Sequence, residues 1–347
     1  MNEGSLLGAA TRESAPAAVP DAIAPFAGDL ERLEGYLRDR SGIGFGLLAG
    51  LLESVFGAGG KRIRPALVFA VGRLADSLGE DGRRRRAAYP ADAVMRLAAA
   101  IETLHTATLV HDDLVDGAAT RRGRPTLHGQ WGMGATILAG DWLFARASAF
   151  SASTGAVRVV QLFAQTLEAL TDGELRQLFG RRGRPTGQEY ELRIYGKTAS
   201  LFETATESAA VLIGATPEQV AALSRFGRSL GMAFQIIDDI LDFVADEAAL
   251  GKPVGSDLRS GQMTLPTLLY LEARPQEDPW GDGRPPETAA IERLVAAIRA
   301  DEAVIARSRS AAEAHLADAL ACLDGFAAGP ARDHLAVIAR YAVARDR

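Results

Sequence analysis

Apolar residues recur with helical spacing along most of this chain of 347 residues, from about residue 26 to the end. Residues 91–115 and residues 223–243 each place large apolar side chains on one face of a long helix. Residues 294–323 are rich in Ala, Leu, Arg and Glu, which favour helix. Alternating patterns with hairpin turns, which are typical of strands, are scarce. The sequence therefore predicts an all-α fold, a single-domain bundle of roughly ten helices.

Glycine and proline mark the breaks between these helices, and none of the breaks has the composition of an interdomain linker. They fall at residues 57–60, 79–82, 123–125, 180–187, 251–255 and 274–286, the last of which is polar enough for a long surface loop. The first 25 residues, rich in Ala and Pro, lack the basic start and apolar run of a secretory signal. We predict a flexible tail at residues 1–25 and one domain at residues 26–347.

The composition excludes several classes of protein. With 48% apolar and 24% charged residues the chain is an ordinary globular protein, and its net charge of −6 argues against general affinity for nucleic acid or anionic membranes. The single cysteine, Cys322, cannot form an internal disulfide, which fits the cytoplasm. We expect no transmembrane segment, because Arg96 and Glu102 interrupt the most apolar stretch.

Two acidic clusters of the form DDxxD are the strongest chemical signal. They consist of Asp112, Asp113 and Asp116 in DDLVD, and of Asp238, Asp239 and Asp242 in DDILD. In each, two carboxylates four residues apart share one helix face at a separation of about 6 Å. Both lie toward the C-terminal ends of apolar helices, where negative charge is unfavourable. One such cluster can arise by chance, but two predict a site for a hard divalent cation such as Mg²⁺.

Basic residues lie near both clusters. Arg121 and Arg122 follow the first cluster, and Lys252 follows the second. Other segments add Lys61, Arg62, Arg64 and Lys197. Carboxylates for a metal, combined with separate Lys and Arg for phosphate oxygens, predict a polyphosphate site rather than a nucleic-acid groove. The GKT at residues 196–198 is not a P-loop, because the GxxxxGK spacing is missing.

The order of the motifs carries a resemblance. GKRIRP, HTATLVHDDLVD, RRGRPT, GDWLFARA, YGKTASLF, FQIIDDILDF and GKPVGSDLRSGQMTLP follow one another up to residue 266. In this order the chain resembles the trans-isoprenyl diphosphate synthases, or polyprenyl synthetases, and in particular the medium- and long-chain members. The resemblance implies a helical bundle around a deep central cavity, normally a homodimer. It also implies condensation of an allylic diphosphate primer with isopentenyl diphosphate and three Mg²⁺ ions in each active site.

The resemblance also implies roles for individual residues. The principal Mg²⁺ ligands of the family match Asp112, Asp116 and Asp238. Asp113, Asp239 and Asp242 complete the two motifs and would contact the metal through water. The groups that hold the allylic diphosphate match Arg121, Lys197, Thr198, Gln235 and Lys252. Those that hold isopentenyl diphosphate match Lys61, Arg64, His105 and Arg122. The catalytic set is Asp112, Asp116, Arg121, Lys197, Asp238 and Lys252. No role falls to His111, which is turned away from the motif.

Product length is predicted from the residues just before the first acidic cluster. Ala107 and Thr108 are small, whereas aromatic residues at these positions stop chain growth early in the family. DDLVD also lacks the two-residue insertion of bacterial farnesyl synthases. We therefore predict a product longer than geranylgeranyl diphosphate. A floor built by Phe150, Leu162 or Phe163 would instead give a short product of farnesyl or geranylgeranyl length.

Three further alternatives stay open. A non-catalytic subunit of a prenyl synthase usually loses an acidic motif, and both are intact here. A terpene cyclase or head-to-head enzyme would not need the residues assigned to isopentenyl diphosphate. A helical nucleic-acid-binding protein would use the RRRR run at residues 83–86 and the two RRGRPT copies at residues 121–126 and 181–186. The net charge opposes this, and we interpret the RRRR run as a solvated loop between helices. We interpret the second RRGRPT as an exposed basic loop, with a lid over the cavity mouth as the alternative.

Overall fold

The structure is a computed structural model that describes residues 21–39, 46–57, 60–121, 124–179, 184–245, 253–280 and 286–344. Its helices are α1 (Ala27–Arg38), α2 (Gly46–Phe56), α3 (Ile63–Arg73), α4 (Gly79–Arg86), α5 (Ala93–Val115), α6 (Leu127–Ser153), α7 (Val157–Phe179), α8 (Gly187–Ile194), α9 (Ser200–Leu212), α10 (Pro217–Val244), α12 (Ser256–Arg259), α13 (Leu265–Ala273), α14 (Thr288–Ala300), α15 (Glu302–Ala321) and α16 (Pro330–Val343). Three short 3-10 turns (Ala24–Phe26, Leu74–Ser77, Pro275–Glu277) and a π-helical turn (Tyr195–Ala199) adjoin them. The strands β1 (Thr120–Arg121) and β2 (Arg124–Pro125) form one small antiparallel hairpin. The predicted all-α class is confirmed, with more helices in the described residues than the roughly ten expected.

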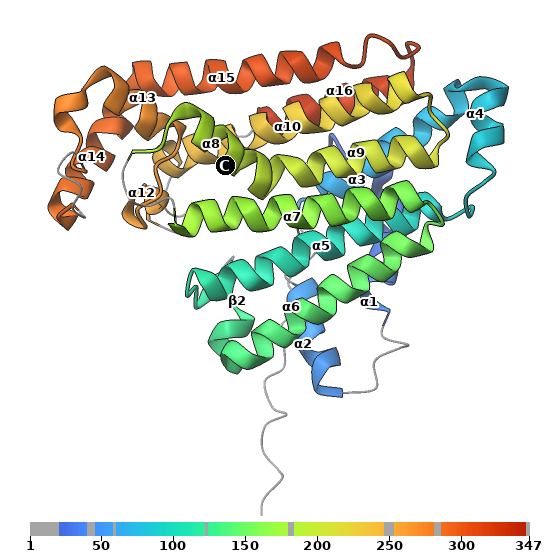
Figure 1. Ribbon diagram of the computed structural model, residues 1–347, viewed down its shortest axis with the longest axis horizontal. Coiled ribbons are helices and arrows are strands. Elements are labelled where there is room, and N and C mark those ends of the chain that lie inside the picture. The colour runs from blue at the N-terminus through green and yellow to red at the C-terminus, as the bar shows by residue number, and fades with distance from the viewer. Residues whose placement is uncertain are drawn as a thin grey trace, which may run out of the picture.

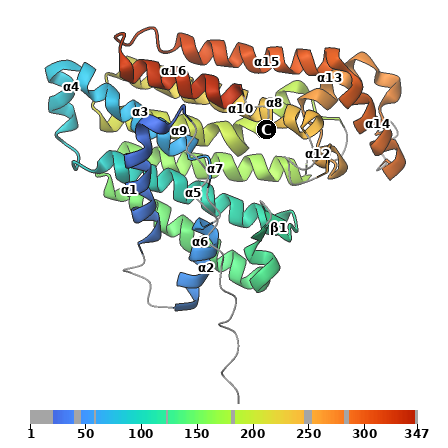
Figure 2. The same ribbon diagram turned by 180° about the vertical axis from the view of Figure 1, so that it is seen from behind.

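The long helices α5, α6, α7, α9, α10 and α15 run side by side along the long axis of the molecule (Figures 1 and 2). Helix α15, drawn in red, borders one edge of this stack, and α2, drawn in blue, lies at the opposite edge. A single continuous hydrophobic core extends from Ile23 to Val343. The domain boundary at residue 26 stays a prediction, since residues 1–20 lie outside the described residues.

Local sequence signals explain where the long helices begin. The side-chain oxygen of Thr216 accepts a hydrogen bond from the backbone amide of Gln219, and the side-chain oxygen of Gln219 accepts one from the backbone amide of Thr216. This capping box, followed by Pro217, starts α10 six residues before the segment that the apolar pattern marked. Helix α5 ends at Val115, as the apolar spacing predicted, and begins at Ala93, two residues after the predicted start at residue 91.

Helix α5 forms the centre of the core. Residues 97–104 are all buried, so neighbouring helices surround it on every side rather than on the one face that the apolar pattern indicated. Three successive alanines, Ala98, Ala99 and Ala100, keep the helix narrow and allow this close packing. Because α5 is surrounded in this way, its polar residues Glu102 and Thr103 are buried as well.

Helix α5 also has the length and apolar composition of a membrane span, but 72% of the apolar window is buried inside the protein. The core helix of a bundle has the same properties. The expected absence of a transmembrane segment and the cytoplasmic location both stay predictions.

One prediction about the elements is wrong. Residues 79–86, expected to be a break followed by a loop, form helix α4. Its first turn carries Glu80 and Asp81 and its last turn carries the four arginines, an arrangement that complements the helix dipole. Arg85 fixes this helix by donating from Nε to the carbonyl of Gly214 at 2.8 Å.

The segment 294–323 is helical, as its composition predicted, but a break at Asp301 that the composition did not indicate divides it into α14 and α15. The backbone of Asp301 leaves the helical conformation, and its carboxylate accepts a hydrogen bond from the amide of Val304 at 3.1 Å. Asp301 thus ends α14 and caps α15. Helix formers on both sides concealed this break, because a cap needs only one residue.

Candidate active site

A cavity of about 500 Å³ opens between α2, α3, α5, the β1–β2 hairpin, α9 and α10. Most of the predicted site residues line it, namely Lys61, Arg64, His105, Thr108, Asp112, Asp113, Arg121, Lys197, Thr198, Gln235 and Asp238. They come from segments spread between residues 61 and 238, so only the folded chain gathers them. The two leading aspartates of the acidic motifs therefore face the same space.

The first acidic motif closes helix α5. Asp112 and Asp113 line the cavity, whereas Asp116 is the exposed C-cap residue and does not. Asp113 accepts a hydrogen bond at 2.6 Å from Nε of Arg121 on β1. Gly117, with φ of 64°, and Ala118 donate back to the last turn and complete a Schellman motif. This turn sends the chain into the hairpin and brings Arg121 over the acidic motif.

Burial raises the pKa of Asp112 to about 6, against the opposing charge of Lys197. The carboxylates of Glu174 and Asp116 add to this increase. Burial also raises the pKa of Asp113, although its ion pair with Arg121 works in the opposite direction. The end of α5 thus concentrates negative charge that the protein alone does not fully compensate.

The second acidic motif lies inside α10 and divides its residues between two environments. Asp238 lines the cavity, while Asp239 and Asp242 are buried away from it. Asp239 accepts hydrogen bonds from the hydroxyl of Tyr190 at 2.8 Å and from the amide of Gln235 at 2.9 Å. Burial, with the charge of Asp257, raises the pKa of Asp239 to about 7.

A hydrogen-bond chain leads from this buried carboxylate back to the cavity. Gln235 donates to Asp239, and its carbonyl accepts from Thr198 at 2.6 Å. Gln235 and Thr198 both line the cavity. Asp239 therefore fixes which end of the Gln235 amide meets Thr198. Asp242 instead accepts a hydrogen bond from the amide of Asp257 at 3.1 Å and ties α12 to α10.

Lys197 lies in the π-helical turn between α8 and α9. Its ammonium donates to Gln177 at 2.8 Å and lies 3.2 Å from a carboxylate oxygen of Glu174. A π-helical turn shifts the side chains on either side of it and is frequent at functional sites. Here it turns both Lys197 and Thr198 toward the cavity.

Two glycines allow this turn to approach α7. A Cβ atom on Gly196 would lie 2.9 Å from Cα of Gly173, and one on Gly173 would lie 2.7 Å from the amide nitrogen of Lys197. Such distances leave no room for a side chain at either position. The close contact brings Glu174 and Gln177 of α7 within reach of Lys197.

The GKRIRP segment, residues 60–65, forms another part of the cavity wall. Lys61 and Arg64 line the cavity beside His105 of α5. The guanidinium of Arg64 lies 4.5 Å above the ring of Phe202, a cation–π contact that orients it. Like Asp112, seven residues further along, His105 faces the cavity, as two helical turns predict.

The two RRGRPT copies have one structural feature in common. Thr126 caps α6 by accepting from Gly129, and Thr186 caps α8 by accepting from Glu189. The first copy also forms the hairpin whose Arg121 meets Asp113. In the second copy, Arg181 and Arg182 lie outside the described residues, as do the predicted site residues Arg122 and Lys252.

The family model for polyprenyl synthetase matches residues 46–295 of this chain. The chain belongs to the polyprenyl synthetase family. The resemblance inferred from the motif order is thereby confirmed.

Individual relatives of this polyprenyl synthetase extend the match. It is 39% identical over 251 residues to solanesyl-diphosphate synthase 2, chloroplastic, of Oryza sativa subsp. japonica, covering 72% of this chain and 60% of the rice protein. It is 35% identical over 302 residues to octaprenyl diphosphate synthase of Escherichia coli (strain K12), covering 84% of this chain and 88% of that protein.

A solved structure with the same fold is a polyprenyl synthase from Caulobacter crescentus CB15, complexed with calcium and isoprenyl diphosphate. The TM-score is 0.83 at 32% identity, over 96% of this chain and all of the other. The agreement in fold covers nearly the whole chain, beyond the segment that the family model matches.

The cavity of this polyprenyl synthetase offers the donors that Mg²⁺ prefers. Asp112, Asp113 and Asp238 supply carboxylate oxygens, and the raised pKa of Asp112 marks a buried charge that a cation would stabilise. In the part of the chain that the structure describes, no three His, Cys, Asp or Glu side chains are grouped closely enough to hold a metal ion by themselves. The residues fit Mg²⁺ bound jointly by carboxylates, water and phosphate oxygens.

The two residues predicted to set product length differ in position. Thr108 lines the cavity, and its hydroxyl donates to the carbonyl of His105 at 2.8 Å. Ala107 is fully buried in the core and does not line the cavity. Of the alternative floor residues, Leu162 and Phe163 are buried as well. The role of Ala107 and Thr108 in product length stays a prediction.

Sequence reasoning missed several polar residues of the site. Glu174 and Gln177 contact Lys197, and Tyr190 holds Asp239. The spacing of Glu174 and Gln177, three residues apart on one face of a helix, was the available signal. Tyr190 gave no signal, because a lone tyrosine in an amphipathic helix is normally a core residue.

Proposed function

We propose that this polyprenyl synthetase condenses an allylic diphosphate with isopentenyl diphosphate, head to tail and in the trans configuration, to give a medium- or long-chain polyprenyl diphosphate. The observation that carries the proposal is one cavity lined by the leading aspartates of both motifs and by cations from three separate segments. The related Caulobacter crescentus protein, complexed with calcium and isoprenyl diphosphate, supports a site for a divalent cation and a diphosphate.

The reaction begins with loss of the diphosphate from the allylic substrate. Asp112 and Asp238, with Asp116, would hold Mg²⁺, which would neutralise the leaving group when bound. Asp113 lines the cavity and would reach the metal through water, whereas Asp239 and Asp242 are buried away from the cavity and act through Gln235 and α12. Lys197 and Arg121 place positive charge where the departing oxygens develop negative charge. Thr198 and Gln235 offer polar contacts beside them, and Lys252 and Arg122 complete the set that the resemblance assigns.

The double bond of isopentenyl diphosphate then attacks the allylic cation. Lys61, Arg64 and His105 form the wall that would hold its diphosphate. A proton is lost from the new chain, for which the departed diphosphate is the base. The apolar part of the cavity, with Leu109, Leu170 and Phe234, keeps water away from the cation.

The decisive assay combines the protein with labelled isopentenyl diphosphate, Mg²⁺ and a farnesyl or geranylgeranyl diphosphate primer. Radiolabel should pass into butanol-extractable polyprenyl diphosphates, and a chelator should abolish the transfer. Absence of label transfer by the folded protein with every primer would favour the non-catalytic subunit. Conversion of the primer without isopentenyl diphosphate would favour a terpene cyclase or head-to-head enzyme.

The names of the octaprenyl and solanesyl synthases support a product longer than geranylgeranyl diphosphate. Mass analysis of the dephosphorylated products measures it directly. Replacing Thr108, which lines the cavity, by Phe or Tyr should shorten the product by one or more isoprene units, because an aromatic ring there would block the path along α5. A dominant farnesol or geranylgeraniol from the unmodified protein would contradict the long-chain assignment.

We also propose that the protein acts as a homodimer. Helix α6 exposes a group of large apolar side chains, Trp131, Met133, Ile137 and Leu138, which a second copy could cover. Light scattering after size exclusion should give twice the mass of 36.7 kDa. The change Leu138→Glu should shift the protein toward the monomer, while Val157→Glu, at an exposed position at the start of α7, serves as the matched control.

A further inference from the structure

Arg62 occupies a position in the GKRIRP segment to which the diphosphate site assigns no role. It lies between Lys61 and Arg64 and lines the same cavity. Among the described residues it is the one non-glycine residue with positive φ, at 48°, and it is the N-cap of α3. A left-handed backbone is unfavourable for a residue with a Cβ atom, so its surroundings must hold it in place.

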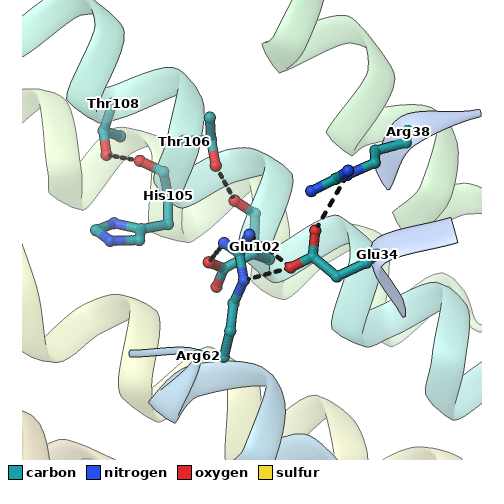
Figure 3. Close-up of polar contacts among 7 residues, drawn as sticks. All are labelled: Glu34, Arg38, Arg62, Glu102, His105, Thr106 and Thr108. Atoms are coloured by element: carbon teal, nitrogen blue, oxygen red, sulfur yellow. Dashed lines mark hydrogen bonds and ion pairs between the residues drawn. The ribbon is translucent and has the colours of Figure 1, made fainter. Parts of the chain in front are cut away.

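The side chain of Arg62 provides that restraint through two carboxylates from different helices (Figure 3). Its Nε donates to Glu34 of α1 at 2.9 Å, and Nη2 lies 2.7 Å from the same oxygen. Its Nη1 donates to Glu102 of α5. The side chains of Arg62 and Glu102 are only 11% and 5% exposed, so this contact is shielded from water and salt.

The charge balance of this cluster decides what Arg62 can do. Burial would lower the pKa of Arg62, but Glu102 and Glu34 outweigh that effect and raise it. One guanidinium faces two carboxylates, so the cluster offers no net positive charge to a diphosphate. Arg38 reaches Glu34 only from the solvent side, at 3.6 Å. Arg62 is therefore a poor diphosphate ligand despite its place in the cavity wall.

The cluster instead joins three elements that carry or flank the predicted isopentenyl diphosphate pocket. Arg62 is next to Lys61 and two residues before Arg64 at the start of α3. Glu102 precedes His105 by three residues, so both lie on one face of α5 (Figure 3). Glu34 adds α1. The distance between the GKRIRP segment and His105 is thus set by a buried ion pair.

We propose that Arg62, held between Glu34 and Glu102, is a positioning residue that fixes Lys61, Arg64 and His105 in the geometry that binds isopentenyl diphosphate. This inference rests on the proposed function. It predicts an effect confined to one of the two substrates, because Lys197 and Arg121 lie on other segments.

The test uses the double variant Arg62→Met with Glu102→Gln, which removes the ion pair without leaving a lone buried charge. The KM for isopentenyl diphosphate should rise about tenfold or more, while the KM for the allylic primer stays within about twofold of the unmodified enzyme. Calorimetric titration with isopentenyl diphosphate should show the same loss of affinity without turnover. Unchanged KM and affinity for isopentenyl diphosphate in a folded double variant would overturn the inference.

Arg158 and Glu207 provide a matched control. They form an ion pair of 2.7 Å between α7 and α9, its glutamate also buried, and neither residue lines the cavity. The double variant Arg158→Met with Glu207→Gln should lower the thermal unfolding midpoint but leave both KM values unchanged. An equal rise of the isopentenyl diphosphate KM in this control would reduce the role of Arg62 to general stability.

Arg62→Gly separates the backbone from the side chain, because glycine adopts positive φ without strain. The variant should still raise the KM for isopentenyl diphosphate, whereas a normal KM would show that the backbone turn alone positions the pocket. If the proposed function itself is wrong, the unmodified protein will neither transfer the prenyl group nor bind isopentenyl diphosphate. This outcome differs from a failure of the Arg62 inference, in which only the variants behave unexpectedly.

Discussion

The two DDxxD motifs are alike in sequence, and both lie toward the C-terminal end of a helix, but their surroundings differ. In both, the leading aspartate, Asp112 or Asp238, lines the cavity. The first motif ends its helix, so Asp116 is exposed at the C-cap and Asp113 meets Arg121 of the hairpin. The second motif lies within α10, where Asp239 and Asp242 are buried and bound by other parts of the protein.

The difference shows that residues of one sequence pattern can have two roles, binding cations at the cavity and fixing neighbouring groups of the protein. The exposed end of the first motif leaves its last carboxylate open to solvent and to arriving ions. The interior of the second motif uses its other two carboxylates to fix Gln235 and α12. An acidic residue next to a metal ligand can thus act on the substrate through its neighbours, without binding the metal.

The largest effect should come from the aspartates that the motifs have in common. Asp112→Ala or Asp238→Ala should each lower kcat by about 10³-fold, because each removes a charge that compensates the leaving diphosphate. Steady-state assays at saturating Mg²⁺ measure this. Asp81→Ala on the exposed helix α4 is the control. Activity that survives either change would refute the prediction that both leading aspartates are needed to compensate the charge of the leaving diphosphate.

A smaller loss of activity should follow from changes at Asp239, the middle aspartate of the second motif, and at its hydrogen-bond partner Tyr190. Tyr190→Phe and Asp239→Asn should each lower kcat/KM by about 10- to 100-fold, because Gln235 and Thr198 lose a fixed orientation. The effects should not add in the double variant, since both act through the same hydrogen-bond chain. Full additivity would mean that Asp239 acts directly on the metal.

The two RRGRPT copies sharpen the comparison further. Arg121→Ala should lower kcat/KM for the allylic substrate by about 10-fold or more, because it removes the cation between Asp113 and the cavity. The equivalent change in the second copy, Arg181→Ala together with Arg182→Ala, should leave turnover within about twofold. Equal losses in both would show that the second copy also reaches the substrate.

The smallest effect concerns pH and stability. The pKa values of Asp112 and Asp239 are raised to about 6 and about 7 in the folded protein. The folded state therefore holds these protons more tightly than the unfolded chain does, and that contribution is lost as pH rises through the raised values. Chelator-treated protein should unfold at a lower temperature at pH 8 than at pH 5. Asp239→Asn should reduce this difference, and an unchanged slope would contradict the raised pKa.

The sequence was most informative where a pattern repeats along a helix. The presence of the long helix α5, the helical class and the cavity position of His105 all follow from a period of 3.6 residues. The RRRR run and the division at Asp301 were missed, because the helix dipole and a single cap outweighed the local composition. Glu174 and Gln177 were missed although their spacing was a signal, and Tyr190 could not be found, since it acts on a residue far away in the chain.

By itself, the sequence determined that this protein carries two carboxylate clusters and enough separate cations for a diphosphate site, since those charges are present in any conformation. Only the tertiary structure decided which carboxylates face the cavity and which are enclosed. It also decided that Arg62, one of three cations in a single motif, is enclosed by Glu34 and Glu102. The physical reason is that burial and pairing depend on which helices pack together, and a charge has its effect only through the groups around it.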